Sequence, residues 1–308
     1  MNTQDGLHPP IEPFAEGWLA VGDGHQIWVE QCGNPDGVPV LFIHGGPGSG
    51  CSPSQRRLFD PQSYRAILVD QRGCGRSLPL GGLDHNMTNH LVADFERVRR
   101  ALGIARWLVF GGSWGSLLAL RYAASAPAVV AGLVLRGIFL GSRAEIARYL
   151  GHAEDDPAAH QIVLCAAKAV LGNDPGLAEA VGCRWLNHER QRMGEPDLLG
   201  PLSAGQQAKV RIQLHYLAQE CFVEQKRLFA DVDRIRSIPA YLVQGLSDPV
   251  CPPVTATRLH AHWPEATFVG VPGAGHSGLL PEVASACQRA LAALADQACL
   301  SGFSGSTA

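Results

Sequence analysis

Short apolar runs alternate with helical patterns along most of the chain, and this alternation restricts the possible folds more than any other sequence feature. The runs are rich in β-branched residues and are bounded by turn residues, as in strands buried on both faces. They end at His44, Asp70, Gly112 and Gly137, and two more span residues 240–245 and 266–273. Strands that alternate with helices predict a mostly parallel sheet covered by helices on both faces.

Two further patterns refine this prediction near the N-terminus. Residues 18–21 and 26–31 alternate apolar and polar side chains, which predicts an antiparallel hairpin at one edge of the sheet. Over residues 88–102 apolar side chains recur at helical spacing. Thr88 stands at the start of this stretch, so we expect it to be the N-cap of a helix that packs on the sheet.

The strand pattern stops between residues 141 and 233. This stretch is rich in alanine, helical in pattern and more charged than its surroundings, and strand patterns resume after it. We therefore expect a helical unit over 141–233 that interrupts a core formed by residues 1–140 and 234–297. The last residues, 298–308, are small and polar with one phenylalanine, which predicts a flexible tail.

Composition excludes several classes of protein. The chain has 308 residues, of which 46% are hydrophobic and 17% charged, as in an ordinary globular protein. Its net charge of −3 provides no excess positive field for nucleic acid. The nine cysteines form no CxxC pair, which argues against a disulfide framework and a zinc cluster. The sequence has no signal-peptide pattern and no apolar run of about 18 residues, so we expect a cytoplasmic protein without a membrane partner.

The sharpest local motif is Gly-Gly-Ser-Trp-Gly at residues 111–115, between an apolar strand pattern and an apolar helical pattern. A serine in such a G-x-S-x-G turn is held in a strained backbone conformation, and the tight turn needs small residues on both sides. The N-terminus of the following helix faces any negative charge that develops there. We predict that Ser113 is a nucleophile, the alternative being a glycine-rich turn with an incidental serine.

Two later residues complete a catalytic arrangement with Ser113. Asp248 follows the strand pattern over 240–245, and His276 follows the one over 266–273. Loops at the carboxyl ends of parallel strands meet at one edge of the sheet. Each residue alone is typical of a turn or a surface loop, but together they predict a triad in the order Ser, Asp, His. In this triad His276 accepts the Ser113 proton and Asp248 holds the imidazole tautomer.

A glycine-rich segment, His-Gly-Gly-Pro-Gly at residues 44–48, supplies candidates for an oxyanion hole. Glycines allow a backbone N–H to face a site without an intervening side chain. We assign the oxyanion hole to the backbone N–H groups of Gly46 and Trp114. His44 is interpreted as a hydrogen-bonded organiser of this loop and not as a base.

Five strings of sequence carry a resemblance to a known family. They are HGGPGSG (44–50), DQRGCGRS (70–77), GGSWGS (111–116), LVLRGIFL (133–140) and GAGHS (273–277). These strings resemble those of the proline iminopeptidases, a branch of the α/β-hydrolases. The resemblance implies an α/β-hydrolase fold with an inserted helical cap, the same triad, and neither metal nor cofactor. It also implies release of N-terminal residues, typically proline, from a short peptide or a similar small molecule.

The cap is where this sequence departs from the family. In the family, two cap segments each supply a carboxylate toward the amino group of the substrate. Here Glu189 keeps the first carboxylate, whereas Gln213 stands where the second is expected. The resemblance therefore implies a substrate-binding pair, Glu189 and Gln213, with a weakened preference for a cationic amine. The alternative for Glu189 is an ordinary solvated carboxylate on a helix.

These features together predict a serine hydrolase that acts through an acyl-enzyme on a small amide or ester. The first choice is an aminopeptidase or amidase similar to proline iminopeptidases. An esterase or acyltransferase of altered specificity in a specialised pathway is a second possibility. A non-catalytic ligand-binding protein of the same fold is a third, because fold alone does not determine function.

Overall fold

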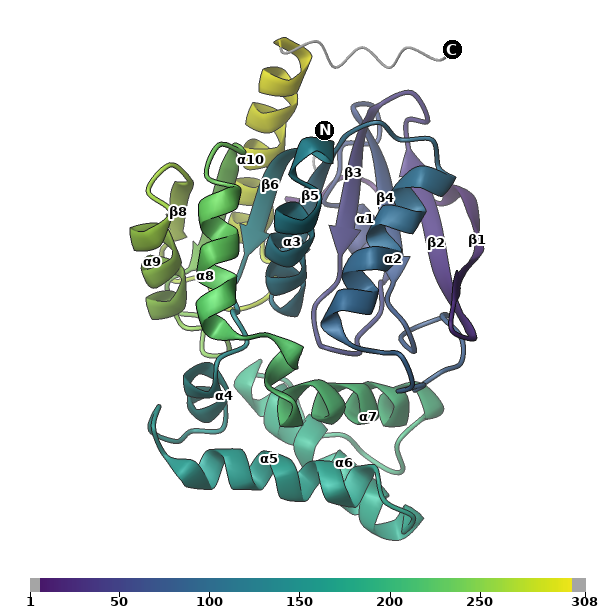
Figure 1. Ribbon diagram of the computed structural model, residues 1–308, viewed down its shortest axis with the longest axis vertical. Helices are drawn as coiled ribbons and strands as arrows, with labels where there is room; N and C mark the ends of the chain where they lie inside the picture. Colours follow the sequence, from purple (N-terminus) through teal and green to yellow (C-terminus); the bar gives the residue numbers. More distant parts are fainter. Residues whose placement is uncertain (1–5, 301–308) are drawn as a thin grey trace.

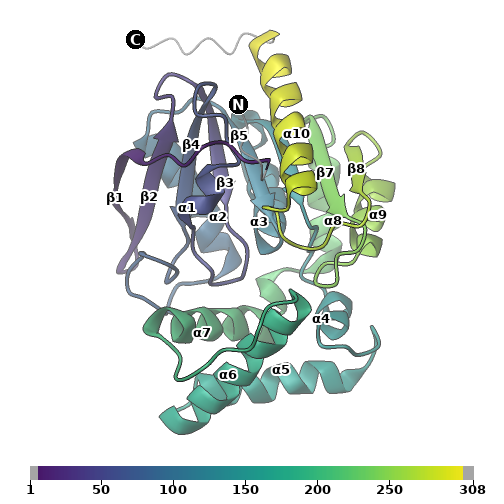
Figure 2. The same cartoon turned by 180° about the vertical axis from the view of Figure 1, so that it is seen from behind.

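A computed structural model describes residues 6–300, which form one eight-stranded sheet with helices on both faces (Figures 1 and 2). The strands are β1 (Pro13–Gly22), β2 (His25–Gly33), β3 (Val38–Ile43), β4 (Tyr64–Asp70), β5 (Trp107–Gly112), β6 (Val130–Arg136), β7 (Ala240–Gly245) and β8 (Thr267–Val271). Their order across the sheet is β1-β2-β4-β3-β5-β6-β7-β8. The strands from β4 to β8 in this order run parallel. The predicted α/β-hydrolase fold is confirmed.

The antiparallel hairpin expected near the N-terminus forms the edge of the sheet. β1 pairs with β2, with Trp18 opposite Trp28, and β2 pairs antiparallel with β4. Next to this hairpin, the strands of the parallel part are apolar on both faces. In β3, for example, Leu41 and Ile43 pack into one apolar cluster, and Val40 and Phe42 pack into a second cluster on the opposite face. A continuous apolar strand pattern therefore corresponds to burial on both sides.

Helices cover the two faces of the sheet unequally. α2 (Thr88–Ala101), α3 (Trp114–Ser125) and α8 (Gln225–Arg234) lie on one face, as Figure 1 shows. α1 (Pro53–Arg56) and α10 (Pro281–Leu300) lie on the other face, which is toward the viewer in Figure 2. α9 (Pro253–His262) packs beside β7. Among the described residues, no helix is both long and apolar enough to cross a membrane.

The start of α2 differs from the sequence expectation. Its N-cap is Met87, with an extended backbone, and Thr88 is already the first helical residue. The Thr88 hydroxyl instead donates a hydrogen bond of 2.5 Å to the carbonyl of Cys221. The prediction of Thr88 as an N-cap is therefore wrong. Its hydroxyl is hydrogen-bonded to a carbonyl 133 residues further along the chain and does not cap the helix.

Four helices between β6 and β7 lie beyond the carboxyl ends of the parallel strands (Figure 1). They are α4 (Arg143–Tyr149), α5 (Pro157–Val170), α6 (Pro175–Arg192) and α7 (Ala204–Ala218), which we call the cap helices. α8 follows them in sequence but packs against α3 over the sheet. Residues 301–308, most of the tail predicted over 298–308, lie outside the described residues.

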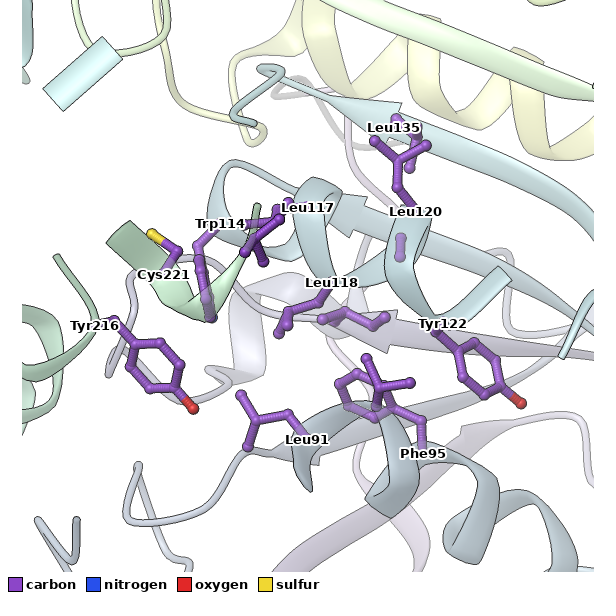
Figure 3. Close-up of a cluster of buried hydrophobic side chains, with 14 of the residues drawn as sticks. Leu91, Phe95, Trp114, Leu117, Leu118, Leu120, Tyr122, Leu135, Tyr216 and Cys221 are labelled. Carbon is purple, nitrogen blue, oxygen red and sulfur yellow. The ribbon is translucent and has the colours of Figure 1, made fainter. Parts of the chain in front are cut away.

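The cap helices and the core share one apolar cluster. Trp114, at the start of α3, lies between core residues such as Leu117 and the aromatic ring of Tyr216 on α7 (Figure 3). Trp114, Leu117 and Tyr216 are all buried. Cap and core are therefore packed together next to Ser113.

Candidate active site

Ser113 lies on the tight turn between β5 and α3. Its backbone has a φ of 56° and a ψ of −126°, a conformation that is strained for a residue with a side chain. The glycines around it are required by close packing. A Cβ on Gly111 would lie 2.2 Å from the carbonyl oxygen of Gly115, and one on Gly115 would lie 2.2 Å from the carbonyl oxygen of Ile43. The GGSWG motif thus forms the turn that its sequence predicts.

The structure brings Ser113, His276 and Asp248 into hydrogen-bond contact. The Nε2 atom of His276 lies 3.1 Å from Oγ of Ser113, and its Nδ1 atom lies 2.7 Å from Oδ2 of Asp248. The other oxygen of Asp248 accepts hydrogen bonds of 2.8 Å from the backbone N–H groups of Val250 and Cys251. The Asp248 carboxylate is therefore held in one orientation and accepts the Nδ1–H of the imidazole, which leaves Nε2 free to face the serine.

Sequence reasoning missed the residues that hold these loops in place. The Arg136 guanidinium, at the end of β6, donates to the carbonyl of His276. The side chain of Gln244, at the end of β7, accepts from the N–H of Ile138 at 3.0 Å and donates to the carbonyl of Cys251 at 2.9 Å. The sequence did contain a signal for these two residues. Each is a polar residue at the carboxyl end of an apolar strand, and such side chains lie at the edge of the sheet.

A hydrogen-bond chain links the two segments assigned to the oxyanion hole. The side-chain amide of Gln71 donates to the carbonyl of His44 at 3.0 Å and accepts from the indole N–H of Trp114 at 2.9 Å. The backbone N–H of Gln71 donates to Nε2 of His44 at 3.1 Å. Burial lowers the pKa of His44, which favours the neutral imidazole that this contact requires. His44 is thus a structural organiser, as the sequence suggested.

The oxyanion-hole candidates themselves lie at suitable backbone positions. Gly46 has a φ of +122°, a conformation that residues with side chains rarely adopt. A Cβ there would lie 2.6 Å from the backbone nitrogen of Gly48. Trp114 is the first residue of α3, where a backbone N–H has no partner within the helix. Both candidates lie close to Ser113. Trp114 is the next residue in the chain, and the loop that carries Gly46 comes so near that a Cβ on Gly45 would lie 3.3 Å from the Cβ of Ser113.

A cavity of about 400 Å³ extends from Ser113 and His276 to the cap helices. Its wall includes Gly46 on the core side and both Glu189 and Gln213 on the cap side. Apolar side chains form much of the remaining wall. They include Phe42, Phe110, Phe139, Ile146, Tyr149 and Leu186. The structure thus brings the predicted cap residues and the predicted nucleophile to one cavity, with room for a small ligand.

Four side chains at the corners between α6 and α7 are joined by three contacts in series, and we call this group the cap square. Trp185 and Glu189 lie one helical turn apart on α6, and Lys209 and Gln213 lie one turn apart on α7. The Trp185 indole donates to Oε1 of Gln213 at 3.0 Å, and Nε2 of Gln213 donates to Oε2 of Glu189 at 3.0 Å. The Lys209 ammonium contacts Oε1 of Glu189. Sequence reasoning missed Lys209, although its position four residues before Gln213 places it on the same face.

Two other ionisable groups line the cavity without being free to react. Glu145 accepts hydrogen bonds from the backbone of Leu140 and from the backbone and hydroxyl of Ser142, and burial raises its pKa. The Cys251 sulfur lies 4.0 Å from Oγ of Ser113. Burial raises the pKa of the Cys251 thiol well above its usual value, so this side chain stays a weakly reactive thiol.

One group of potential metal ligands occurs among the described residues, away from this cavity. Asp23, His85 and His90 place one ligand atom each within 4.8 Å of one another. None of the three lines the cavity, and the Asp23 carboxylate already accepts a hydrogen bond of 3.2 Å from Arg72. This group therefore has no part in the chemistry at Ser113.

The fold and this site define the class of the protein, an α/β-hydrolase. Residues 38–160 match the family described as alpha/beta hydrolase fold, and residues 214–296 match the family described as TAP-like protein. A solved structure of a proline iminopeptidase-related protein from Thermus thermophilus superposes with a TM-score of 0.61 at 22% identity, covering 92% of this chain and 98% of that one. This likeness concerns the fold.

Sequence relatives identify the branch. The chain is 40% identical to the proline iminopeptidase of Xylella fastidiosa strain Temecula1, over 90% of this chain and 95% of the relative. It is 41% identical to the proline iminopeptidase of Xanthomonas citri, over 92% and 97%. The chain belongs to the proline iminopeptidase family. It is a serine hydrolase of the aminopeptidase kind, and these relatives do not favour the esterase, acyltransferase and non-catalytic alternatives.

Proposed function

We propose that this enzyme removes the N-terminal residue from short peptides and aminoacyl amides through an acyl-enzyme on Ser113. One observation carries this proposal. Ser113 Oγ lies 3.1 Å from a His276 imidazole whose other nitrogen lies 2.7 Å from Asp248, at the wall of a cavity that a cap covers. A hydroxyl next to a base that a carboxylate orients is the arrangement that nucleophilic acyl transfer requires.

In the proposed reaction, His276 takes the Ser113 proton while Oγ attacks the carbonyl carbon of the scissile amide. The N–H groups of Gly46 and Trp114 donate to the oxygen that becomes negative in the tetrahedral intermediate. His276 then gives the proton to the leaving amine, and the acyl group stays on Ser113 as an ester. A water molecule, deprotonated by His276, attacks this ester, and His276 returns the proton to Oγ of Ser113 as the ester bond breaks and the N-terminal amino acid leaves.

The cavity supports a small substrate residue at the cap end. Its volume of about 400 Å³ and its apolar wall suit a proline-like or other small side chain better than a long polar one. The N-terminal residue lies toward Glu189 and Gln213 in this proposal, with its carbonyl carbon at Ser113. The relatives named above are proline iminopeptidases, which supports proline as the first residue to test.

A panel of chromogenic substrates tests the proposed function. It combines aminoacyl 4-nitroanilides, including the prolyl compound, with N-acetylated aminoacyl anilides and simple acyl esters. Hydrolysis of at least one free-amine anilide is expected, with loss of activity by several orders of magnitude in Ser113→Ala. Hydrolysis of acyl esters alone, with no aminoacyl anilide cleaved, would show that the enzyme is not an aminopeptidase.

A further inference from the structure

In the cap square, each oxygen of Glu189 already has a partner. Its Oε1 contacts the Lys209 ammonium and its Oε2 accepts from Gln213. The direction of the second hydrogen bond is determined by Trp185, because an indole N–H can only donate. Gln213 therefore presents its oxygen to Trp185 and its N–H to Glu189. Both oxygens of Glu189 and the side-chain oxygen of Gln213 therefore have partners before a ligand binds.

Among the described residues, the other carboxylates that line the cavity also have partners. Glu145 accepts from Leu140 and Ser142, as described above. Glu195 forms an ion pair with Arg190 at 3.1 Å. A substrate that carries an N-terminal ammonium therefore finds no carboxylate in this wall without a partner, and a desolvated ammonium needs one.

Lys209 is held at this position by its backbone. Gly48 in the oxyanion-loop segment, with a φ of +92°, brings that loop against α7 so closely that a Cβ on Gly48 would lie 2.7 Å from the Lys209 carbonyl oxygen. The Lys209 side chain then extends along the cavity wall to Glu189. The chain has only two other lysines, Lys168 and Lys226, and both are exposed outside the cavity.

We propose that Lys209 is a specificity-determining residue whose ammonium occupies the amine position beside Glu189. A substrate with a free N-terminal amine has to share Glu189 with the like charge of the Lys209 ammonium or displace it, whereas a substrate with a neutral N-terminus does not. The enzyme thus discriminates only weakly between free-amine and N-acylated ligands. This inference rests on the proposed function for its substrate class, and it assigns the weak preference to a cation and not only to the absence of a second carboxylate.

Calorimetric titration of two ligands tests this inference. L-prolinamide carries the amine, and N-acetyl-L-prolinamide lacks its charge. The titrations are made in a Ser113→Ala background, so that neither ligand is consumed. In Lys209→Met the ratio of the two dissociation constants should shift in favour of the amine by about tenfold or more, since a carboxylate gains a charge-assisted hydrogen bond to the ligand.

Three matched variants separate the causes. Lys209→Arg keeps the cation and should behave as the parent protein does, and Lys168→Met removes an exposed lysine and should change nothing. Lys209→Met combined with Glu189→Gln should lose the gain, because the gain depends on the released carboxylate. An unchanged or reduced preference for the amine in Lys209→Met, or no measurable binding of it, would overturn the inference. A gain that persists in the double variant would overturn the assignment to Glu189.

The outcome for the proposed function is separate. Hydrolysis is measured with Ser113 intact, on the substrate panel described above. Tighter amine binding in Lys209→Met combined with no aminoacyl anilide cleaved by the parent enzyme would support the role of Lys209 and reject the aminopeptidase. Cleavage of aminoacyl anilides by the parent enzyme, with no shift in amine binding in Lys209→Met, would support the aminopeptidase and reject the role of Lys209.

Discussion

The ring of Tyr216 on the cap packs against the indole of Trp114, the residue that follows Ser113, with ring centroids 4.8 Å apart and planes inclined by 58°. Figure 3 shows the two side chains meeting where α7 approaches the start of α3. The Tyr216 hydroxyl donates to the side chain of Asn86 at 2.8 Å. The cap therefore supports the backbone segment that carries one of the proposed oxyanion donors.

Removal of the Tyr216 ring should affect both stability and activity. Tyr216→Ala leaves a cavity beside a buried indole, which is expected to cost about 3–5 kcal/mol of unfolding free energy. Because Trp114 loses its packing partner, kcat should also fall in the protein that remains folded. Urea unfolding and kinetics on a simple acyl ester measure the two effects. Tyr216→Phe keeps the ring and should retain most of the activity. Equal kcat values in Tyr216→Ala and the parent enzyme would show that this packing does not support the site.

His276→Ala should remove nearly all activity, because the imidazole that lies 3.1 Å from Oγ of Ser113 is the proposed acceptor of its proton. The value of kcat/KM on a simple acyl ester should fall by several orders of magnitude. Asp248→Asn should also reduce kcat/KM, because the amide no longer holds the reactive imidazole tautomer. A folded His276→Ala protein that keeps more than about a tenth of the parent kcat/KM would contradict the role of His276.

Gln213→Glu should strengthen selection for a free amine. One glutamate oxygen can still accept from Trp185, and the other would lie beside Glu189, so that two carboxylates share the single cation of Lys209. The ratio of kcat/KM for free-amine over N-acetylated prolyl anilides should rise by about tenfold to a hundredfold. Glu189→Gln should lower the same ratio.

The parent enzyme itself should hydrolyse prolyl anilides weakly. Glu189, the only glutamate of the cap square, already contacts the Lys209 ammonium and therefore attracts the amine of the substrate less strongly. Efficient prolyl hydrolysis by the parent enzyme, with no change in either variant, would mean that Glu189 and Gln213 do not form the amine site.

The buried carboxylate of Asp70 should contribute to stability in a pH-dependent way. It accepts hydrogen bonds from the N–H of Cys51 at 2.6 Å and from the backbone and Nε of Arg76 at 2.9 and 2.8 Å. Burial, the largest single effect, would raise the pKa of Asp70, but the hydrogen bonds from Arg76 and Cys51 and the interaction with His44 together outweigh it and hold this pKa below its usual value. Asp70→Asn is expected to destabilise the protein by about 3 kcal/mol at neutral pH.

The sign of the pH dependence follows from the lowered pKa of Asp70. Its contribution is complete above the pKa of an unfolded aspartate, about 3.9, and is lost as the pH falls through the lower folded value. Urea unfolding at neutral pH and at about pH 3 should therefore show the gap between the parent protein and Asp70→Asn shrinking in acid. The exposed Asp155→Asn is the control. A gap that widens in acid would contradict the direction of this shift.

Sequence alone was sufficient to place Ser113, Asp248 and His276 at one edge of the sheet. Each follows a strand whose apolar pattern is unambiguous, and the carboxyl ends of parallel strands share an edge. Thr88 was wrongly predicted as an N-cap because capping is a local signal, and a distant carbonyl at Cys221 took its hydroxyl. Lys209 was not predicted because its contact depends on how α6 and α7 cross, which local periodicity does not determine.

Trapping the acyl-enzyme tests the central claim most directly, namely that Ser113 is the nucleophile. The enzyme is mixed with a 4-nitrophenyl ester at low pH, quenched, and analysed by intact-mass and peptide mass spectrometry. We predict one acyl group per chain on the peptide that contains Ser113, and none in Ser113→Ala. An acyl group that persists in Ser113→Ala, or that resides on Cys251, 4.0 Å from the serine oxygen, would contradict the assignment.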